Sequence, residues 1–286
     1  MSGVTVVVDS TASLPLSLAG RHGILVIPMR LTFGHESLRD GVDIQPAEFY
    51  RRLASGGPLP KTAAPPPEDF VASFKQAADQ GAEGVVCLTI AKELSSTYDT
   101  ARLAAGLAAE PLKGFRINIV DSRTAGGAEG LAALEAARAA GRGASLEEVT
   151  ATAERSIRSV QFIGVLDTLY YIWKGGRVPR TALWATSLLQ IKPILEIRDG
   201  RVQPVERPRT QKRAIQRLLA LVAGRAAGRA MRVMVLHGDA PREAELLAEE
   251  VRDKVRCEEL LVSTFPPVIG AHTGPGLLGV AFLPVE

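Results

Sequence analysis

Three hydroxyl side chains follow one another at Ser95, Ser96 and Thr97, shortly after the apolar run GVVCLTI at 84–90. Hydroxyls and unpaired backbone N–H groups at the start of a helix bind anions, because the helix dipole places partial positive charge there. A helix cap needs only one such side chain. The segment therefore fits either plain helix capping or an anion or carboxylate site, and taken alone it leaves both open.

Two further polar clusters follow apolar runs. Asp9, Ser10 and Thr11 come after VTVVV, while Asp121 and Ser122 come after FRINIV. Turn and capping chemistry would explain both clusters. Ligands also gather at the ends of strands in parallel α/β sheets, so a binding role is the alternative.

A histidine lies in the glycine-rich segment VIGAHTGPGLLGVAFLP near the end of the sequence. Gly274, Gly276 and Gly279 satisfy the dinucleotide pattern G-x-G-x-x-G, but neither the helix nor the acidic residue that the pattern requires can follow them. The glycines instead permit a close backbone approach. We expect His272 to lie in a turn and to face a ligand, with a core histidine as the alternative.

Two other residues have weaker signals. Thr62 precedes the proline-rich loop AAPPPEDF, where it is either loop filler or a ligand contact. His237 follows the strand-like run MRVMVL, and we predict a structural role at a strand end. G-x-S-x-G, a P-loop, HExxH and clustered metal ligands are all absent from the sequence. The pattern predicts binding rather than catalysis, with no catalytic residue, no metal site and no cofactor.

The composition is that of an ordinary globular protein, with 46% hydrophobic and 23% charged residues. The net charge of +3 comes without a run of like charges or a basic stripe, so we expect no nucleic-acid partner. Cys87 and Cys257 lie in separate apolar runs and are predicted to be small buried hydrophobes in a reducing cytoplasm. No signal peptide and no apolar run of membrane-spanning length is recognised, which predicts a cytoplasmic protein without stable membrane insertion.

Alternating strand-like and helix-like segments must position these side chains. Short β-branched runs and alanine-rich periodic segments alternate in the first half, which predicts an α/β unit with a largely parallel sheet and flanking helices. The strands are expected at 4–8, 84–90 and 115–120, and the helices at about 66–80, 95–109, 126–141 and 145–159.

The second half has a different pattern. Asp199-Gly200 in LEIRDGRV is a hairpin signal, so antiparallel pairing and a mixed sheet with helices are expected there. Strand-like runs occur at 161–166, 193–198, 201–206, 231–236, 258–264 and 277–283. At 286 residues a single core tends to split. We predict domains at 1–160 and 161–286, with elements at 24–33 able to cross to either half.

Taken together, nine stretches in order resemble the DegV family over essentially the whole chain. They are VVDSTASLP, PKTAAP, ELSSTYDTA, VDSRTAGGAEG, LYYIWKGGR, LLQIKPILEIRDG, RPRTQKRA, LHGDA and IGAHTGPGLLGVAF. The resemblance implies a two-domain protein that buries the acyl chain of a long-chain fatty acid. In some members it further implies the binding subunit of a fatty-acid kinase, which presents the carboxyl group to a separate kinase subunit.

The resemblance also implies the site residues. Thr62, Ser95 and His272 would hold the carboxylate, with Ser96 and Thr273 as neighbours. Two basic residues carried by family motifs are candidates for a positive rim that receives phosphate or an acidic partner, with an ordinary solvated surface as the alternative. They are Arg177 and Arg209.

The chain departs from the family pattern in two places. Ala63 and Ala64 stand where the family has serine and glutamine, which removes secondary polar contacts. Ser96 replaces a glycine and narrows the approach to the head group. Two rivals remain: a lipid hydrolase or acyltransferase that uses one of the serines, and a regulatory module in which lipid is a structural filler. These motifs do not determine the length or unsaturation of the acyl chain, the existence of a partner kinase, or the oligomeric state.

Overall fold

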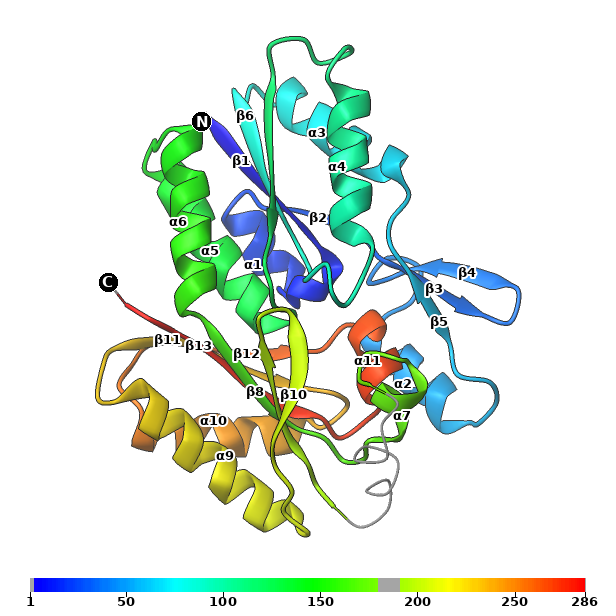
Figure 1. The fold of residues 1–286 in the computed structure, drawn as a ribbon, viewed down its shortest axis with the longest axis vertical. Helices are drawn as coiled ribbons and strands as arrows, with labels where there is room; N and C mark the ends of the chain where they lie inside the picture. The colour runs from blue at the N-terminus through cyan, green and yellow to red at the C-terminus, as the bar shows by residue number, and fades with distance from the viewer. Residues whose placement is uncertain (1–2, 180–190, 286) are drawn as a thin grey trace.

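The first sheet is parallel and has four strands, in the order β2-β1-β6-β7. The computed structural model describes residues 3–179 and 191–285 (Figure 1). The strands are β1 (Val4–Asp9), β2 (Leu25–Ile27), β6 (Gly84–Thr89) and β7 (Arg116–Asp121). The expected parallel sheet is confirmed, and each strand predicted for it begins and ends within one residue of its predicted bounds.

Helices cover both faces of this sheet, which explains why its central strands β1 and β6 are apolar on both sides. On β1, Val6 and Val8 belong to the core under α5 and α6, whereas Val7 packs with the phenylalanines of α3 on the opposite face. The helices are α1 (Leu16–Arg21), α3 (Pro67–Asp79), α4 (Thr97–Ala108), α5 (Gly127–Gly141) and α6 (Leu146–Ser159). A short 3-10 turn, η1 (Ser10–Ala12), follows β1.

The second sheet is mixed and has six strands, in the order β10-β9-β8-β13-β11-β12. All neighbours are antiparallel except β11 and β12. The predicted hairpin is confirmed: Asp199 and Gly200 have φ values of 51° and 76°, the left-handed conformation of its two-residue turn. The strands are β8 (Gln161–Val165), β9 (Ile194–Arg198), β10 (Arg201–Glu206), β11 (Met231–His237), β12 (Cys257–Thr264) and β13 (Leu278–Pro284).

Helix α5 lies between the two large sheets (Figure 1). It contacts β1 of the first sheet and both β11 and β13 of the second. Its sequence, GAEGLAALEAARAAG, is built of small residues, most of them buried, because sheets approach it from two sides. The core under α5 is therefore continuous between the halves, and the division at residue 160 stays a prediction.

A third, antiparallel sheet was not predicted. It has the order β4-β3-β5 and is formed by β3 (Arg30–Phe33), β4 (Glu36–Arg39) and β5 (Lys61–Ala63), with α2 (Pro46–Ala54) packed beside it. The strands are only three or four residues long, too short for alternation to be recognised. Of the elements at 24–33, β2 joins the parallel sheet and β3 joins this small sheet.

The remaining helices complete the second half. Helices α9 (Gln211–Ala226) and α10 (Pro241–Lys254) cover one face of the mixed sheet, while α7 (Tyr170–Lys174) packs against α11 (Pro267–Thr273). Cys87 is buried in β6 as expected, whereas Cys257, at the start of β12, is only half-buried. Both thiols are free.

Candidate ligand-binding cavity

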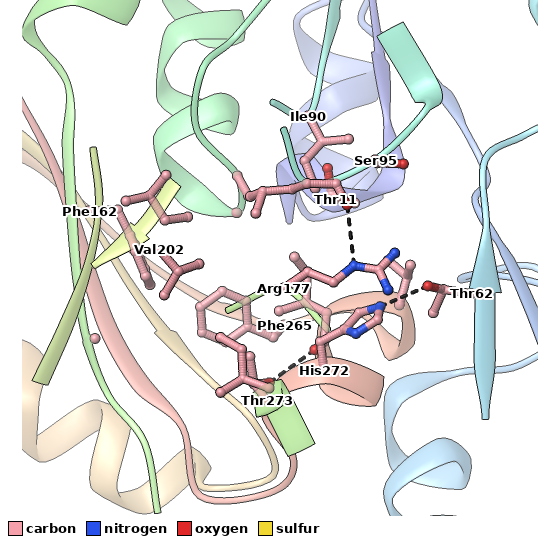
Figure 2. A pocket seen from close by; sticks show the side chains of 18 of the residues that line it. Thr11, Thr62, Ile90, Ser95, Phe162, Arg177, Val202, Phe265, His272 and Thr273 are labelled. Carbon is pink, nitrogen blue, oxygen red and sulfur yellow. Dashed lines mark hydrogen bonds between the residues drawn. The ribbon is translucent and has the colours of Figure 1, made fainter. Parts of the chain in front are cut away.

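An apolar cavity opens where the three sheets meet, and the five residues predicted to hold the carboxylate all line it (Figure 2). Of the two predicted rim residues, Arg177 lines it and Arg209 does not. Its empty volume is about 1020 Å³, part of it open to solvent. The walls come from both halves of the chain: Ile90 and Ala125 from the first, and Leu195, Val202 and Phe265 from the second. Most of the lining is apolar.

Polar side chains gather at one end of this cavity. Thr62 on β5, Ser95 before α4 and His272 on α11 line it together, and Thr62 Oγ1 lies 2.7 Å from His272 Nε2. Ser96 and Thr273 also line the cavity, but the Thr273 hydroxyl donates to the Ile269 carbonyl. The fold thus brings together five residues that the sequence spreads over more than 200 positions.

Two of these residues lie in elements other than those expected. His272 belongs to the helix α11 rather than to a turn, and Thr62 belongs to the strand β5 rather than to a loop. Pro267 in the first turn of α11 supplies a φ suited to helix initiation, and Gly274, with φ of 72°, ends the helix. The glycine-rich composition concealed this helix, because glycine is a poor helix former.

Aromatic rings packed against the glycines explain why this segment lacks larger side chains. A Cβ on Gly274 would lie 2.2 Å from the Tyr171 ring, and one on Gly279 would lie 2.6 Å from Phe162. Likewise, a Cβ on Gly175 would lie 2.3 Å from His272 Nδ1, so α7 and α11 approach each other closely around the histidine. No larger side chain fits at these positions without displacement.

The three consecutive hydroxyls have different environments. Helix α4 begins at Thr97, two residues later than predicted, and Ser96 at its N-cap makes no side-chain capping bond. Ser95 Oγ lies 2.8 Å from the hydroxyl of Thr97, which is fully buried beside the Met29 sulfur. Ser95 is half-buried and Ser96 is exposed. Ser95 therefore lines the cavity just before α4, with the Thr97 hydroxyl as its local hydrogen-bond partner.

Burial keeps His272 neutral. Desolvation, followed by the positive charge of Arg177, lowers the pKa of His272 to about 3. Nδ1 is buried without a hydrogen-bond partner, while Nε2 meets Thr62. An unpaired acceptor is tolerated better than an unpaired N–H, so we assign the proton to Nε2. The imidazole then donates to Thr62 Oγ1, and the threonine proton is free to point into the cavity.

Arg177 places a cation at the same end of the cavity. Its Nε donates to the Leu94 carbonyl at 3.2 Å and its Nη1 to the Gly175 carbonyl at 2.7 Å. Burial lowers the pKa of Arg177, and no carboxylate pairs with it among residues 3–179 and 191–285. A half-buried guanidinium without a counter-ion is costly. Arg209, by contrast, is exposed and does not line the cavity.

A buried pair of carboxyl groups adjoins the cavity, and sequence reasoning did not identify it. Thr11 Oγ1 lies 2.5 Å from Asp9 Oδ1 and 2.8 Å from Glu129 Oε2. Burial and the nearby Asp9 charge raise the pKa of Glu129 well above its usual value. Asp9 accepts backbone N–H bonds from Thr11 and Ile90. Protonated Glu129 therefore donates to Thr11, which donates to Asp9. The available signal was Glu129 itself, an acidic residue among small residues in the first turn of α5.

A third buried carboxyl group, that of Asp40, contacts the helix that carries His272. Asp40 Oδ2 accepts from Ser10 Oγ at 2.5 Å, and its Oδ1 accepts from the Val268 N–H at 3.4 Å in the first turn of α11. The side chain thus connects η1, the end of β4 and α11. Burial raises the pKa of Asp40 to about 7, against the opposing hydrogen bond from Ser10.

This raised pKa predicts a pH-dependent stability. The folded protein holds the Asp40 proton more tightly than the unfolded chain, so stability falls as pH rises from about 4 towards 7. From about pH 5 to about pH 8, wild type is expected to lose about 2–3 kcal/mol relative to Asp40→Asn. Urea unfolding at both pH values measures the difference. Asp43→Asn, which replaces an exposed carboxylate with a pKa of about 2, serves as control. Equal pH slopes for wild type and Asp40→Asn would contradict the prediction.

The other polar candidates lie outside the cavity. Asp121 Oδ1 accepts from the Arg123 N–H at 2.9 Å, and the Ser122 hydroxyl donates to the Thr124 carbonyl, which is turn chemistry. His237 ends β11 as predicted, with Nδ1 accepting from the Ala240 N–H. No group of three or more potential metal ligands occurs among the residues that the structure describes. Within the same residues, no helix is long and apolar enough to cross a membrane.

The arrangement does not form a serine triad. His272 Nε2 meets Thr62, and the Ser95 hydroxyl meets Thr97. Asp9 is occupied by Thr11 and by backbone N–H groups, and His272 Nδ1 has no carboxylate to orient it. Nucleophilic catalysis needs a base bonded to the serine and a third group bonded to that base, and neither bond is present among these residues.

The fold and the cavity define a class: an α/β protein whose parallel and mixed sheets border an apolar pocket with hydroxyl groups and the guanidinium of Arg177 among its described lining residues. The chain belongs to the DegV family. A family model described as "Uncharacterised protein, DegV family" matches residues 3–285.

Relatives of known sequence and structure agree with this assignment. A DegV domain-containing protein of Streptomyces coelicolor is 38% identical over 278 residues, covering 97% of each chain. The solved structure of a DegV family protein from Thermus thermophilus, described by its fatty acid binding, has 33% identity and a TM-score of 0.88 over 100% of both chains. A stearic acid-binding protein of Eubacterium ventriosum has 25% identity and a TM-score of 0.90, covering 98% of this chain and 97% of its own.

Proposed function

We propose that this protein binds a long-chain fatty acid, with the acyl chain in the cavity and the carboxylate at the polar end. The observation that carries the proposal is the arrangement of Thr62, Ser95, His272 and Arg177 at the end of an otherwise apolar pocket. The fatty-acid-binding descriptions of the Thermus and Eubacterium relatives support it. The protein acts as a carrier, without a catalytic residue or cofactor of its own.

The affinity comes mainly from the acyl chain. Burying about 14 methylenes at ~0.8 kcal/mol each yields roughly 11 kcal/mol, from which ordering of ligand and protein subtracts several kcal/mol. The carboxylate must then be compensated, because an unpaired buried charge is too costly. Hydroxyl donors from Thr62 and Ser95 and the positive charge of Arg177 provide that compensation.

The carboxylate is held as an anion by a relay. Neutral His272 donates from Nε2 to Thr62 Oγ1, which orients the threonine proton towards the ligand oxygen. Arg177 supplies the positive charge that the neutral imidazole does not. His272 is therefore a positioning residue, and Thr62, Ser95 and Arg177 contact the head group.

We infer that the polar end presents the bound carboxylate to a partner protein. Ser96 beside it is exposed, so a bound carboxylate lies close to solvent. A separate fatty-acid kinase subunit that forms the acyl phosphate fits this position, and we propose exposed Arg209 as a contact for such a partner. Kinase-dependent turnover that is the same in wild type, Arg177→Ala and Arg209→Ala would exclude a basic rim.

Mass spectrometry tests the proposed function directly. An organic extract of the purified protein is expected to contain a long-chain fatty acid, and native mass spectrometry is expected to find one molecule per chain. Added fatty acid should exchange with the bound one, which a structural filler would not do. A protein that is empty and takes up no added acid would overturn the proposal, and fluorophosphonate labelling of Ser95 or Ser96 would then test the hydrolase alternative.

A further inference from the structure

An aromatic side chain, Phe162, lies at the end of the cavity opposite Thr62 and Ser95. Figure 2 shows Thr62 and Ser95 at one side of the pocket and Phe162 and Val202 at the other, with Phe265 between them. Phe162 lies on β8 and is half-buried. An acyl chain whose carboxylate meets Thr62 and Ser95 therefore has its methyl end directed towards Phe162.

Two glycines leave the space that the Phe162 ring occupies. Gly164 on β8 and Gly279 on β13 are directly opposite each other in the sheet register. A Cβ on Gly164 would lie 3.2 Å from Phe162 Cζ, and one on Gly279 would lie 2.6 Å from Cε2. The ring of Phe265 meets Phe162 edge to face, with centroids 6.0 Å apart and planes at 85°. The pair of glycines and the second ring define one position for Phe162.

A charged cleft adjoins this end of the cavity. It shares Phe162, Glu196 and Ile197 with the apolar cavity and is otherwise lined largely by polar side chains. Glu196 forms an ion pair with Arg225 at 2.5 Å, and Arg225 also donates to Gln161 Oε1 at 3.1 Å. A methyl end that passed Phe162 would remove water from this ion pair without replacing its hydrogen bonds, which is unfavourable.

We propose that Phe162 is the specificity-determining residue that limits the length of the bound acyl chain, because its ring separates the apolar cavity from the charged cleft. The inference rests on the proposed fatty-acid binding and deepens it. Chains that end before the ring gain about fourfold in affinity for each added buried methylene. Chains that reach the ring gain nothing further and must fold back or displace it.

The test is a competition among saturated fatty acids of increasing length, from myristate to behenate, followed by native mass spectrometry. Wild type is expected to take up acids to a definite length and to discriminate against longer ones. Phe162→Ala should extend that limit, with a gain of about fourfold for each further methylene that the opened end buries. Phe162→Leu should extend it by less. Phe33→Ala, which removes another half-buried phenyl ring from outside the cavity, should keep the wild-type limit.

The outcomes separate the two proposals. Uptake by wild type with the same length limit in Phe162→Ala and Phe162→Leu would overturn the role of Phe162 and leave fatty-acid binding intact. A change of limit in Phe33→Ala equal to that in Phe162→Ala would also overturn it. If Phe162→Ala does not fold, Phe162→Leu decides. Absence of uptake by wild type would overturn the proposed function itself.

Discussion

Replacing Thr62 and Ser95 together with alanine is expected to reduce sharply the preference for a free fatty acid over its methyl ester, with Arg177 left to compensate the carboxylate. Both hydroxyls line the polar end of the cavity, and the acyl walls lie elsewhere. A hydrogen bond to a charged group contributes about 1.5–3 kcal/mol. Losing two such bonds should therefore weaken binding of the free acid at least roughly 100-fold in the double variant. The ester, which has no charge to compensate, should bind the variant within a few-fold of wild type. Competition binding of the two ligands measures the ratio.

A matched control tests whether the loss is specific to the head group. Thr32 and Ser37 are paired on β3 and β4, next to the strand that carries Thr62, and neither lines the cavity. Thr32→Ala with Ser37→Ala removes the same number of hydroxyls and should keep the preference of wild type for the acid. If the variant at Thr62 and Ser95 kept that preference as well, the proposed carboxylate site would be wrong.

Arg177→Gln is expected to weaken fatty-acid binding and to raise the pKa of His272 at the same time. The guanidinium places a positive charge at the polar end, and losing a charge-assisted bond costs about 1.5–3 kcal/mol, or roughly 10- to 100-fold in affinity. Its positive charge is also the second cause of the lowered pKa of His272, after burial. Binding measurements report the first effect, and an NMR titration of the imidazole in the ligand-free protein reports the second.

Arg209→Gln provides the comparison, because Arg209 is exposed and lies outside the cavity lining. This variant should bind fatty acid as wild type does. Unchanged affinity in Arg177→Gln together with slower kinase-dependent turnover would instead assign Arg177 to the partner or phosphate. Unchanged affinity and an unchanged His272 titration would contradict both the electrostatic role and the position of the side chain.

The long, strongly patterned elements were predictable from the sequence. VTVVV and GVVCLTI are apolar because both faces of the parallel sheet are covered, whereas FRINIV at the sheet edge packs Ile117 and Ile119 on one face only. Asp199-Gly200 can adopt the positive φ values that the hairpin turn requires. Local chemistry determined these elements, so the tertiary structure only had to assemble them.

The short elements were not predictable, because tertiary contacts rather than local chemistry determine them. Strand β5 has three residues, and the seven-residue helix α11 contains a proline and a glycine, so neither has a periodicity that distinguishes it from a loop. Both are held by hydrogen bonds with distant segments. His272 donates to Thr62, and the Val268 N–H donates to Asp40.

The sequence by itself determined the family motifs, the α/β class and the side chains that would hold an anion. Only the tertiary structure decided that Arg177 belongs to the cavity and Arg209 does not, that Glu129 is buried beside Asp9, and that His272 is neutral. The physical reason is that residue types and local periodicity are properties of neighbouring positions. Burial, electrostatic environment and the end of a cavity arise where segments far apart in the chain meet.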